Sequence, residues 1–191
     1  MEEKLKELEE LEQKCAACTA CALHTGRTKS VFGVGNPHSP LMFVGEGPGE
    51  QEDLKGQPFV GRAGQLLDKF LSAIELDRTG CYIANMVKCR PPKNRDPLPD
   101  EQEQCIAYLR EQFKLIRPKI VVCLGRIAAQ RLISPDFKVT LRHGEWISRG
   151  ESLFMGTFHP ASLLRNPRQK PDAFSDFLKI REKLKELTGN G

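Results

Sequence analysis

Four short apolar runs, separated by segments of helical character, constrain the fold more than any other feature of this sequence. The runs lie at residues 41–44, 81–87, 120–124 and 152–158. Apolar runs of this length, bounded by glycine, proline and polar residues, are typical of buried strands. Strands that alternate with helices predict a mainly parallel sheet, joined by right-handed crossovers and covered on both faces. We therefore expect an α/β fold of three layers, α/β/α, around a central, mainly parallel four-stranded sheet.

The whole chain, residues 1–191, is expected to form a single domain, because 191 residues can bury a full core. Segments 2–14 and 173–187 carry apolar residues on one face only, which predicts amphipathic helices. No apolar run is long enough to span a membrane, and the acidic N-terminal segment differs from a signal peptide. We therefore expect a cytoplasmic monomer that does not associate with membranes.

A glycine-rich, acidic turn, Gly45-Glu46-Gly47-Pro48-Gly49, follows the first apolar run. Ligands of open α/β sheets bind at the carboxyl ends of strands, and glycines permit a close approach there. A Walker phosphate loop is excluded, because no Gly-Lys-Ser/Thr follows. The alternative is an ordinary turn with solvated acids. Asn85 and His159 end two other runs, so both are expected beside this turn.

Seven cysteines, in a chain without a secretory signal, favour metal binding, redox chemistry or burial over disulfides. Cys15 and Cys18 form a Cys-x2-Cys pair, and Cys89 and Cys105 complete a set of four thiolates. Such a set suits either a tetrahedral zinc ion or an iron–sulfur cluster, and the spacing does not separate the two.

The remaining three cysteines have different interpretations. Cys21 competes with the other ligands, because Cys15, Cys18 and Cys21 resemble part of a ferredoxin motif. Cys81 and Cys123 lie within apolar runs and are interpreted as core residues.

The exit of the second run is basic and stiffened by prolines, within a chain of net charge +4. A mildly basic chain is compatible with nucleic acid but does not prove binding to it. The basic residues are candidate phosphate contacts, although a charged run is more often a solvated face. They are Lys88, Arg90, Lys93 and Arg95.

The glycine turn and the late motif His159-Pro160-Ala161-Ser162-Leu163-Leu164-Arg165 together resemble the family-four uracil-DNA glycosylases, the iron–sulfur branch of that superfamily. Residues 58–61, Asn85 and the four cysteines match in the same order, so the resemblance covers nearly the whole chain. It implies a DNA repair enzyme of base excision repair. Such an enzyme flips uracil out of single- or double-stranded DNA and hydrolyses its N-glycosidic bond, which leaves an abasic site.

The resemblance also implies a structural [4Fe-4S] cluster and omits Cys21 from its ligands. The implied ligands are Cys15, Cys18, Cys89 and Cys105. In this interpretation the cluster ties the N-terminal segment to the basic loop.

Three further residues take roles in the base pocket by resemblance. Phe59 stacks on the uracil ring, Asn85 hydrogen-bonds to uracil N3–H and O4, and His159 donates to uracil O2 as the base leaves as an anion. Without the flanking motifs, Phe59 would be interpreted as a core residue, Asn85 as a turn cap and His159 as structural.

The carboxylates are harder to assign. The best-known glycosylases of the superfamily carry aspartate where this chain has Gly47, and glycine cannot activate water. We therefore expect Glu46 to position the water or stabilise the sugar cation, helped by backbone groups around Gly47. Glu52 is assigned to the uracil C5 edge, where it would exclude thymine. Either Glu50 or Glu52 is alternatively a solvated loop acid.

Leu163 matches the position of a wedge that fills the gap left by the flipped nucleotide, with a half-buried helix residue as the alternative. Ser162 and Arg165 are candidate phosphate contacts. Asn94 matches a family loop position to which no role is assigned.

Two rival functions differ in class. The first is a related DNA-binding protein that traps uracil-DNA covalently, using a histidine in a longer loop and a glutamine in the first motif. Here Gly47 stands in that motif, and residues 88–99 contain no histidine. The second rival is a non-enzymatic electron-transfer or zinc-structural protein.

Overall fold

The computed structural model describes residues 2–189 and contains a six-stranded sheet in the order β1-β3-β2-β4-β6-β5. Its strands are β1 (Val34–Gly35), β2 (Leu41–Gly45), β3 (Tyr82–Asn85), β4 (Ile120–Leu124), β5 (Ile147–Arg149) and β6 (Ser152–Thr157). β3, β2, β4 and β6 run parallel, which confirms the predicted central sheet. The predicted number of four was too low, because β1 and β5 add antiparallel edges. These edges have two and three residues and no apolar run.

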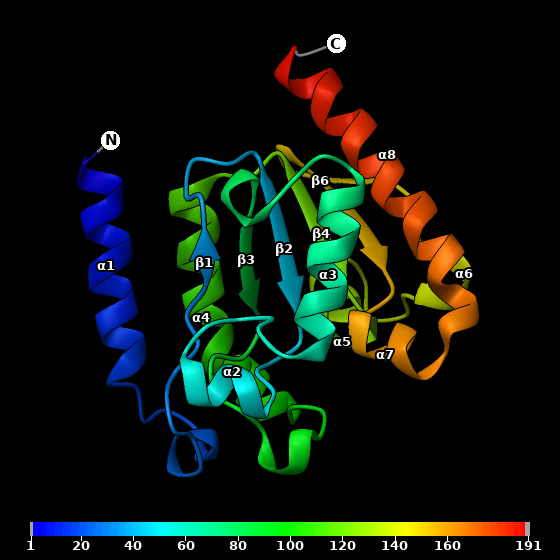
Figure 1. The fold of residues 1–191 in the computed structure, drawn as a ribbon. Helices are drawn as coiled ribbons and strands as arrows, with labels where there is room; N and C mark the ends of the chain where they lie inside the picture. The colour runs from blue at the N-terminus through cyan, green and yellow to red at the C-terminus, as the bar shows by residue number, and fades with distance from the viewer. Residues whose placement is uncertain (1, 190–191) are drawn as a thin grey trace.

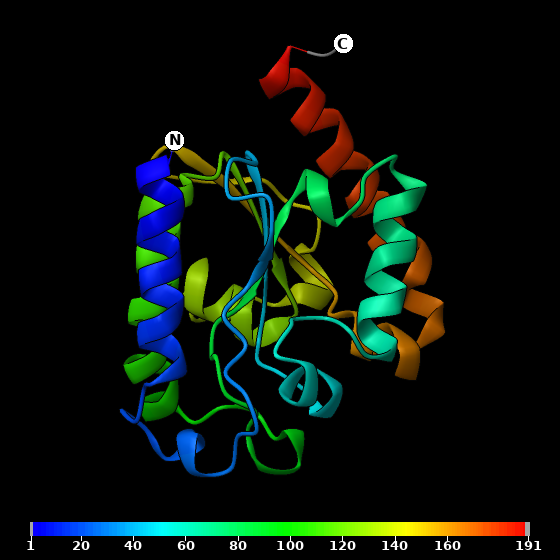
Figure 2. The ribbon, with the colours of Figure 1, turned by 60° about the vertical axis from the view of Figure 1, so that its left-hand side comes forward.

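Helices cover both faces of the sheet (Figure 1). They are α1 (Glu2–Ala16), α2 (Glu50–Lys55), α3 (Arg62–Ala73), α4 (Pro99–Ile116), α5 (Arg126–Leu132), α6 (Val139–Arg142), α7 (Pro160–Arg165) and α8 (Lys170–Thr188). Figure 2 shows α1 and α4 on one side of the sheet and α3 and α8 on the other. The α/β/α layering predicted from the sequence is therefore confirmed.

Aromatic packing joins the sheet to the α3–α8 layer. Phe43 of β2 stacks on Phe177 of α8 at 5.7 Å between ring centroids, and Phe70 of α3 stacks on the same ring at 4.9 Å. One core cluster extends along the chain from Leu8 to Ile180. The proposal of a single domain rests on this shared core.

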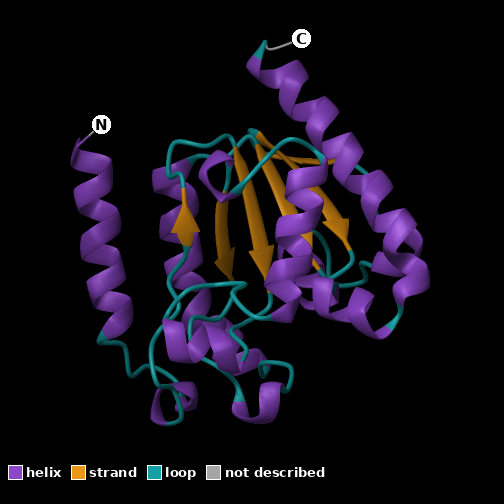
Figure 3. Cartoon of the chain, in the orientation of Figure 1, coloured by secondary structure: helices purple, strands orange, loops and turns teal. Residues whose placement is uncertain are grey.

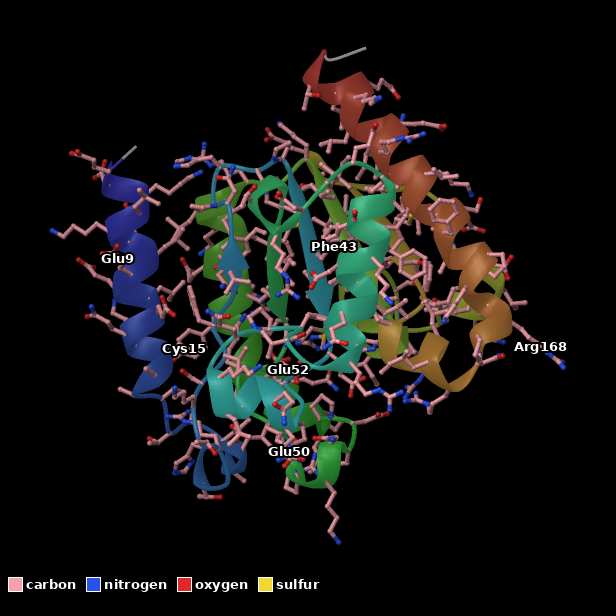
Figure 4. All side chains as sticks on the ribbon, viewed as in Figure 1. Glu9, Cys15, Phe43, Glu50, Glu52 and Arg168 are labelled. Carbon is pink, nitrogen blue, oxygen red and sulfur yellow. The ribbon has the colours of Figure 1, made fainter. Side chains whose placement is uncertain are left out.

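The parallel strands all end at one edge of the sheet, the lower edge in Figure 1, and long loops gather there (Figure 3). This arrangement follows from the parallel order, as expected from the sequence. Glu50 and Glu52 lie at this edge, and Cys15 lies near it at the end of α1 (Figure 4). In the part of the chain that the structure describes, no helix is both long enough and apolar enough to cross a membrane.

Candidate functional site

A cavity of about 550 Å³ opens at the edge where the strands end, and this volume is typical of a small-molecule site. The glycine turn after β2, the end of β3, the start of α7 and the loop before α4 enclose it. The residues singled out in the sequence that line it include Glu46, Gly47, Glu52, Phe59, Asn85, Asn94, Arg95, His159, Ser162 and Arg165. The strand order thus brings together segments that are far apart in the chain.

The side-chain amide of Asn85 is buried without a hydrogen-bond partner. Asn85 is 1% exposed, and its Nδ2 and Oδ1 are the only buried side-chain nitrogen or oxygen atoms within residues 2–189 that lack a partner. Each such unsatisfied group costs about 1–3 kcal/mol. A Cβ at Gly45 would overlap Oδ1, so glycine keeps the space beside the amide open. This amide is arranged for a ligand that brings both a donor and an acceptor.

Phe59 forms a wall of the cavity in a constrained backbone conformation. Its φ of 54° lies in the left-handed region, which costs a non-glycine residue of order 1–3 kcal/mol. The Phe59 ring lies 5.6 Å from the His159 ring, centroid to centroid. A Cβ at Gly64 would overlap the Phe59 carbonyl, so α3 approaches this turn only because residue 64 is glycine.

Two charged side chains hold the Phe59 turn. Arg78 donates through Nη1 to the Pro58 carbonyl at 2.9 Å and through Nη2 to the Phe59 carbonyl. Glu52 Oε1 accepts from the backbone N–H groups of residues 60 and 61 at 2.9 and 2.8 Å. Glu52 is therefore a bonded carboxylate at the cavity and not a solvated loop acid. Sequence reasoning missed Arg78, because no local pattern marks a side chain that reaches back to a distant turn.

His159, immediately before α7, presents one tautomer to the cavity. The backbone N–H of Ala161 donates to His159 Nδ1 at 3.1 Å, so the ring proton lies on Nε2. Burial and, to a lesser extent, Arg165 lower the pKa of His159 to about 4, while Glu52 opposes this shift. A Cβ at Gly125, where φ is 94°, would lie 2.8 Å from His159 Cβ. The result is a neutral ring that donates from Nε2 at pH 7.

Glu46 is the carboxyl group of the glycine turn that faces the cavity. Burial and, to a lesser extent, Asp96 raise the pKa of Glu46 to about 7, against the opposing effects of Arg126 and Arg165. Asp96 and Arg126 form an ion pair and also line the cavity. Sequence reasoning singled out neither, since one lies in a proline-rich loop and the other opens a short helix. A carboxyl group that titrates near neutral pH suits proton transfer or water activation.

Gly47 leaves no room for a side chain. A Cβ at this position would lie 2.6 Å from Val87 Cγ2, and Val87 is fully buried. The Val87 backbone N–H also donates to the Glu46 carbonyl at 3.1 Å, which fixes the two segments together. Glu50, by contrast, is exposed and lies 3.6 Å from Arg90, so it matches the solvated loop acid of the alternative interpretation.

The structure corrects the role assigned to Leu163 in α7. This side chain is 1% exposed and belongs to the hydrophobic core, whereas a wedge must project from the surface into DNA. It is also more buried than the half-buried alternative. Its neighbour Ser162 donates through Oγ to the His159 carbonyl at 2.7 Å, and Arg165 is exposed at the cavity.

The basic loop is held by internal bonds. Arg90 Nε donates to Asn94 Oδ1 at 2.8 Å, and Arg95 pairs with Glu101 at 2.7 and 2.8 Å. These contacts engage two arginines that the sequence offered to phosphates, and they give Asn94 a structural role. Lys93 is exposed at the tip of this loop.

Five cysteines line a second, smaller cavity between the end of α1, the exit of β3 and α4. They are Cys15, Cys18, Cys21, Cys89 and Cys105. Cys81 and Cys123 lie apart from this group and are fully buried in the core, as predicted.

The donor set of this cavity consists of cysteine thiols, which suit either a tetrahedral zinc ion or an iron–sulfur cluster. Arg27 Nη1 donates to Cys89 Sγ at 3.2 Å, and the Lys88 backbone N–H donates to Cys105 Sγ at 3.2 Å. Such donors orient and stabilise thiolate ligands.

Lys88 itself cannot contact a phosphate, contrary to the expectation from the sequence. Its side chain is 1% exposed, and its Nζ donates to groups inside the protein. The pattern of basic residues did not show that the first of them points inward.

Comparison with known proteins gives concordant matches. The family profile described as the uracil DNA glycosylase superfamily matches residues 32–185. The chain is 45% identical to a type-4 uracil-DNA glycosylase of Archaeoglobus fulgidus over 168 residues, which cover 84% of each chain. It is 44% identical to one of Sulfurisphaera tokodaii, over 82% of this chain and 75% of that one. A third, from Thermotoga maritima, is 45% identical over 75% of this chain and 76% of its own.

Proposed function

Because this chain belongs to the type-4 group of the uracil-DNA glycosylase superfamily, we propose that it excises uracil from DNA by hydrolysing the N-glycosidic bond. The product is an abasic site, the entry point of base excision repair. The observation that carries the proposal is the buried, unpartnered amide of Asn85 in a cavity that also holds Phe59 and His159.

Uracil supplies what the Asn85 amide lacks. Oδ1 accepts from uracil N3–H, and Nδ2 donates to uracil O4, while the Phe59 ring stacks on the base. Cytosine presents the opposite donor and acceptor pattern, so its binding would leave buried groups unpaired, at about 1–3 kcal/mol each. A base reaches this cavity only after it is flipped out of the duplex.

His159 Nε2–H acts on the leaving group. As the bond to the sugar breaks, negative charge develops on uracil O2, and a donor aimed at that atom stabilises the transition state more than the bound substrate. The neutral ring donates this hydrogen bond without bringing a buried positive charge into the substrate complex.

Glu46 acts on the sugar side. Its carboxylate orients the attacking water or stabilises the oxocarbenium-like sugar, with backbone groups around Gly47 as partners. Glu52 holds the Phe59 turn through Oε1 and borders the cavity at the C5 edge of uracil. Ser162, Arg165 and Lys93 are the proposed phosphate contacts at the rim.

The rate of excision is expected to rise with pH through a midpoint near 7. Because the folded-state pKa of Glu46 is raised to about 7, the carboxylate form is lost as the pH falls below that value. His159 stays neutral in this range and adds no further pH dependence to the rate. Single-turnover rates between about pH 6 and 8 test this. Glu46→Gln should abolish the rise of the rate with pH and lower the rate at high pH roughly a hundredfold. An unchanged rise with pH in this variant would reject the role of Glu46.

Arg78→Ala is expected to lower kcat/KM roughly tenfold, because it releases the carbonyls that hold Phe59 in its left-handed conformation. Most of the loss should appear in KM, since stacking acts on bound base and transition state alike. The control is Asp68→Asn, which removes the ion pair to Arg78 but keeps both carbonyl contacts. Equal losses of kcat/KM in the two variants would show that the ion pair matters and not the hydrogen bonds from Arg78 to the two carbonyls.

We also propose that Cys15, Cys18, Cys89 and Cys105 hold a [4Fe-4S] cluster, with Cys21 beside them as a non-ligand. When bound, the cluster cross-links α1 to the exit of β3 and to α4. Iron and acid-labile sulfide in equal amounts, with broad visible absorbance, would support this; stoichiometric zinc would contradict it. Cys21→Ser should retain full iron, whereas Cys89→Ser should lose it.

The direct test of function is incubation with an oligonucleotide that contains one uracil, followed by alkaline cleavage of abasic sites. Strand cleavage at uracil, and none with thymine in its place, is the expected result. A stable protein–DNA adduct on a denaturing gel would instead favour the covalent-trapping alternative. Intact DNA with no adduct would reject both functions.

A further inference from the structure

Lys88 lies between the cysteine site and the base pocket, in the turn that leaves β3. It is 1% exposed. Its Nζ donates to the Asn85 carbonyl at 2.8 Å, the Phe32 carbonyl at 3.0 Å and Gln112 Oε1 at 2.7 Å. An ammonium group has three donors, so all of them are used inside the protein.

The acceptor Gln112 is itself fixed. It is fully buried, and its Nε2 donates to the Phe32 carbonyl and to the Tyr82 hydroxyl, each at 3.1 Å. The position of Lys88 Nζ is therefore determined by rigid neighbours. Through this network the backbone of Asn85, the residue proposed to hydrogen-bond to uracil, is tied to the centre of the protein.

Within residues 2–189, Lys88 forms no ion pair with a carboxylate. A buried charge without an opposite charge is strongly destabilising. The acidic groups close to Lys88 are thiols of the cysteine site, which Lys88 borders. Thiolates that bind iron would supply the missing negative charge.

We infer that Lys88 is a positioning residue that couples the cluster site to uracil recognition: the thiolates balance its charge, and its Nζ holds the Asn85 backbone in the base-reading position. This inference rests on the proposed function. It assigns the cysteine site a role beyond cross-linking, because the negative charge at that site keeps Lys88 in place below the base pocket.

The test compares iron-loaded wild type, Lys88→Met and Lys119→Met. Lys119 is the control, because it is an exposed lysine that lines neither the base cavity nor the cysteine cavity. The first measurement is the midpoint potential of the cluster. The second is the ratio of affinities for two uncleavable oligonucleotides, one with 2′-fluorodeoxyuridine and one with 2′-fluorothymidine.

Lys88→Met is expected to shift the potential to more negative values, because reduction adds negative charge near a lost cation. It should also reduce the preference for uracil over thymine about tenfold, since a displaced amide no longer pairs with the base. Lys119→Met should change neither quantity. An unchanged potential, or an unchanged preference, in Lys88→Met would overturn the coupling.

If Lys88→Met does not fold with iron, Gln112→Met keeps the lysine and removes one of its acceptors. This variant should lose preference for uracil without a shift in potential, and a wild-type preference would overturn the inference. Failure of the proposed function is distinguishable, because it would appear as a wild-type protein that excises no uracil.

Discussion

Replacing His159 with alanine is expected to lower the rate of uracil excision by about two to three orders of magnitude, the usual loss when one transition-state donor is removed. The affinity for uracil-DNA should change little, because the bond to O2 strengthens only as the base becomes an anion. Single-turnover kinetics with a uracil oligonucleotide measure the rate, and the uncleavable fluorinated oligonucleotide measures the affinity.

The matched control is His38→Ala, which removes an exposed histidine that does not line the cavity. It should behave as wild type. A His159→Ala protein with wild-type rate would remove the leaving-group role. A His159→Ala protein with a normal single-turnover rate constant but weaker binding of uracil-DNA would instead show that His159 contacts the bound substrate and not the transition state.

The second large effect is expected at Asn85. Asn85→Ala removes both bonds to the uracil edge and should weaken uracil binding by about 1–3 kcal/mol for each bond, roughly a tenfold to hundredfold loss per bond. Unlike the His159 variant, it should lose affinity as well as rate. The control Asn36→Ala changes an asparagine whose side chain only supports a turn outside the cavity.

Asn85→Asp tests the pairing itself. A protonated carboxyl group can donate to cytosine N3 and accept from cytosine N4–H2, so activity should shift from uracil towards cytosine. Oligonucleotides with uracil, cytosine or thymine at one position give the three rates. A variant that loses uracil excision and gains no cytosine excision would leave Asn85 as a binding residue without the proposed base pairing.

The sequence predicted the parts of this fold that depend on periodic hydrophobicity. The four parallel strands, the helices around α3 and α8, and the common edge of Asn85, His159 and the glycine turn all follow from that pattern. The edge strand β1 was missed, because two partly exposed residues pair only after the central sheet exists.

The role of a site residue was predictable where the residue type and its motif indicate the chemistry. It was not predictable where tertiary contacts determine whether the side chain is buried or exposed. Lys88 looked like part of a basic surface, yet its Nζ is buried among backbone carbonyls. Leu163 matched a wedge position, yet it packs in the core. Arg78 carried no signal, because its role depends on the strained φ of Phe59, which no local sequence pattern specifies.

The close fit between position 47 and Val87 has a consequence for substitutions at residue 47. An aspartate introduced at residue 47 would meet a buried, branched side chain 2.6 Å from its first carbon, and overpacking of this kind typically costs about 1–3 kcal/mol. A smaller residue at position 87 would remove this cost. The Glu46 carboxylate and the tight contact at residue 47 therefore belong together in this chain, and a carboxylate moved to residue 47 would favour a smaller side chain at residue 87.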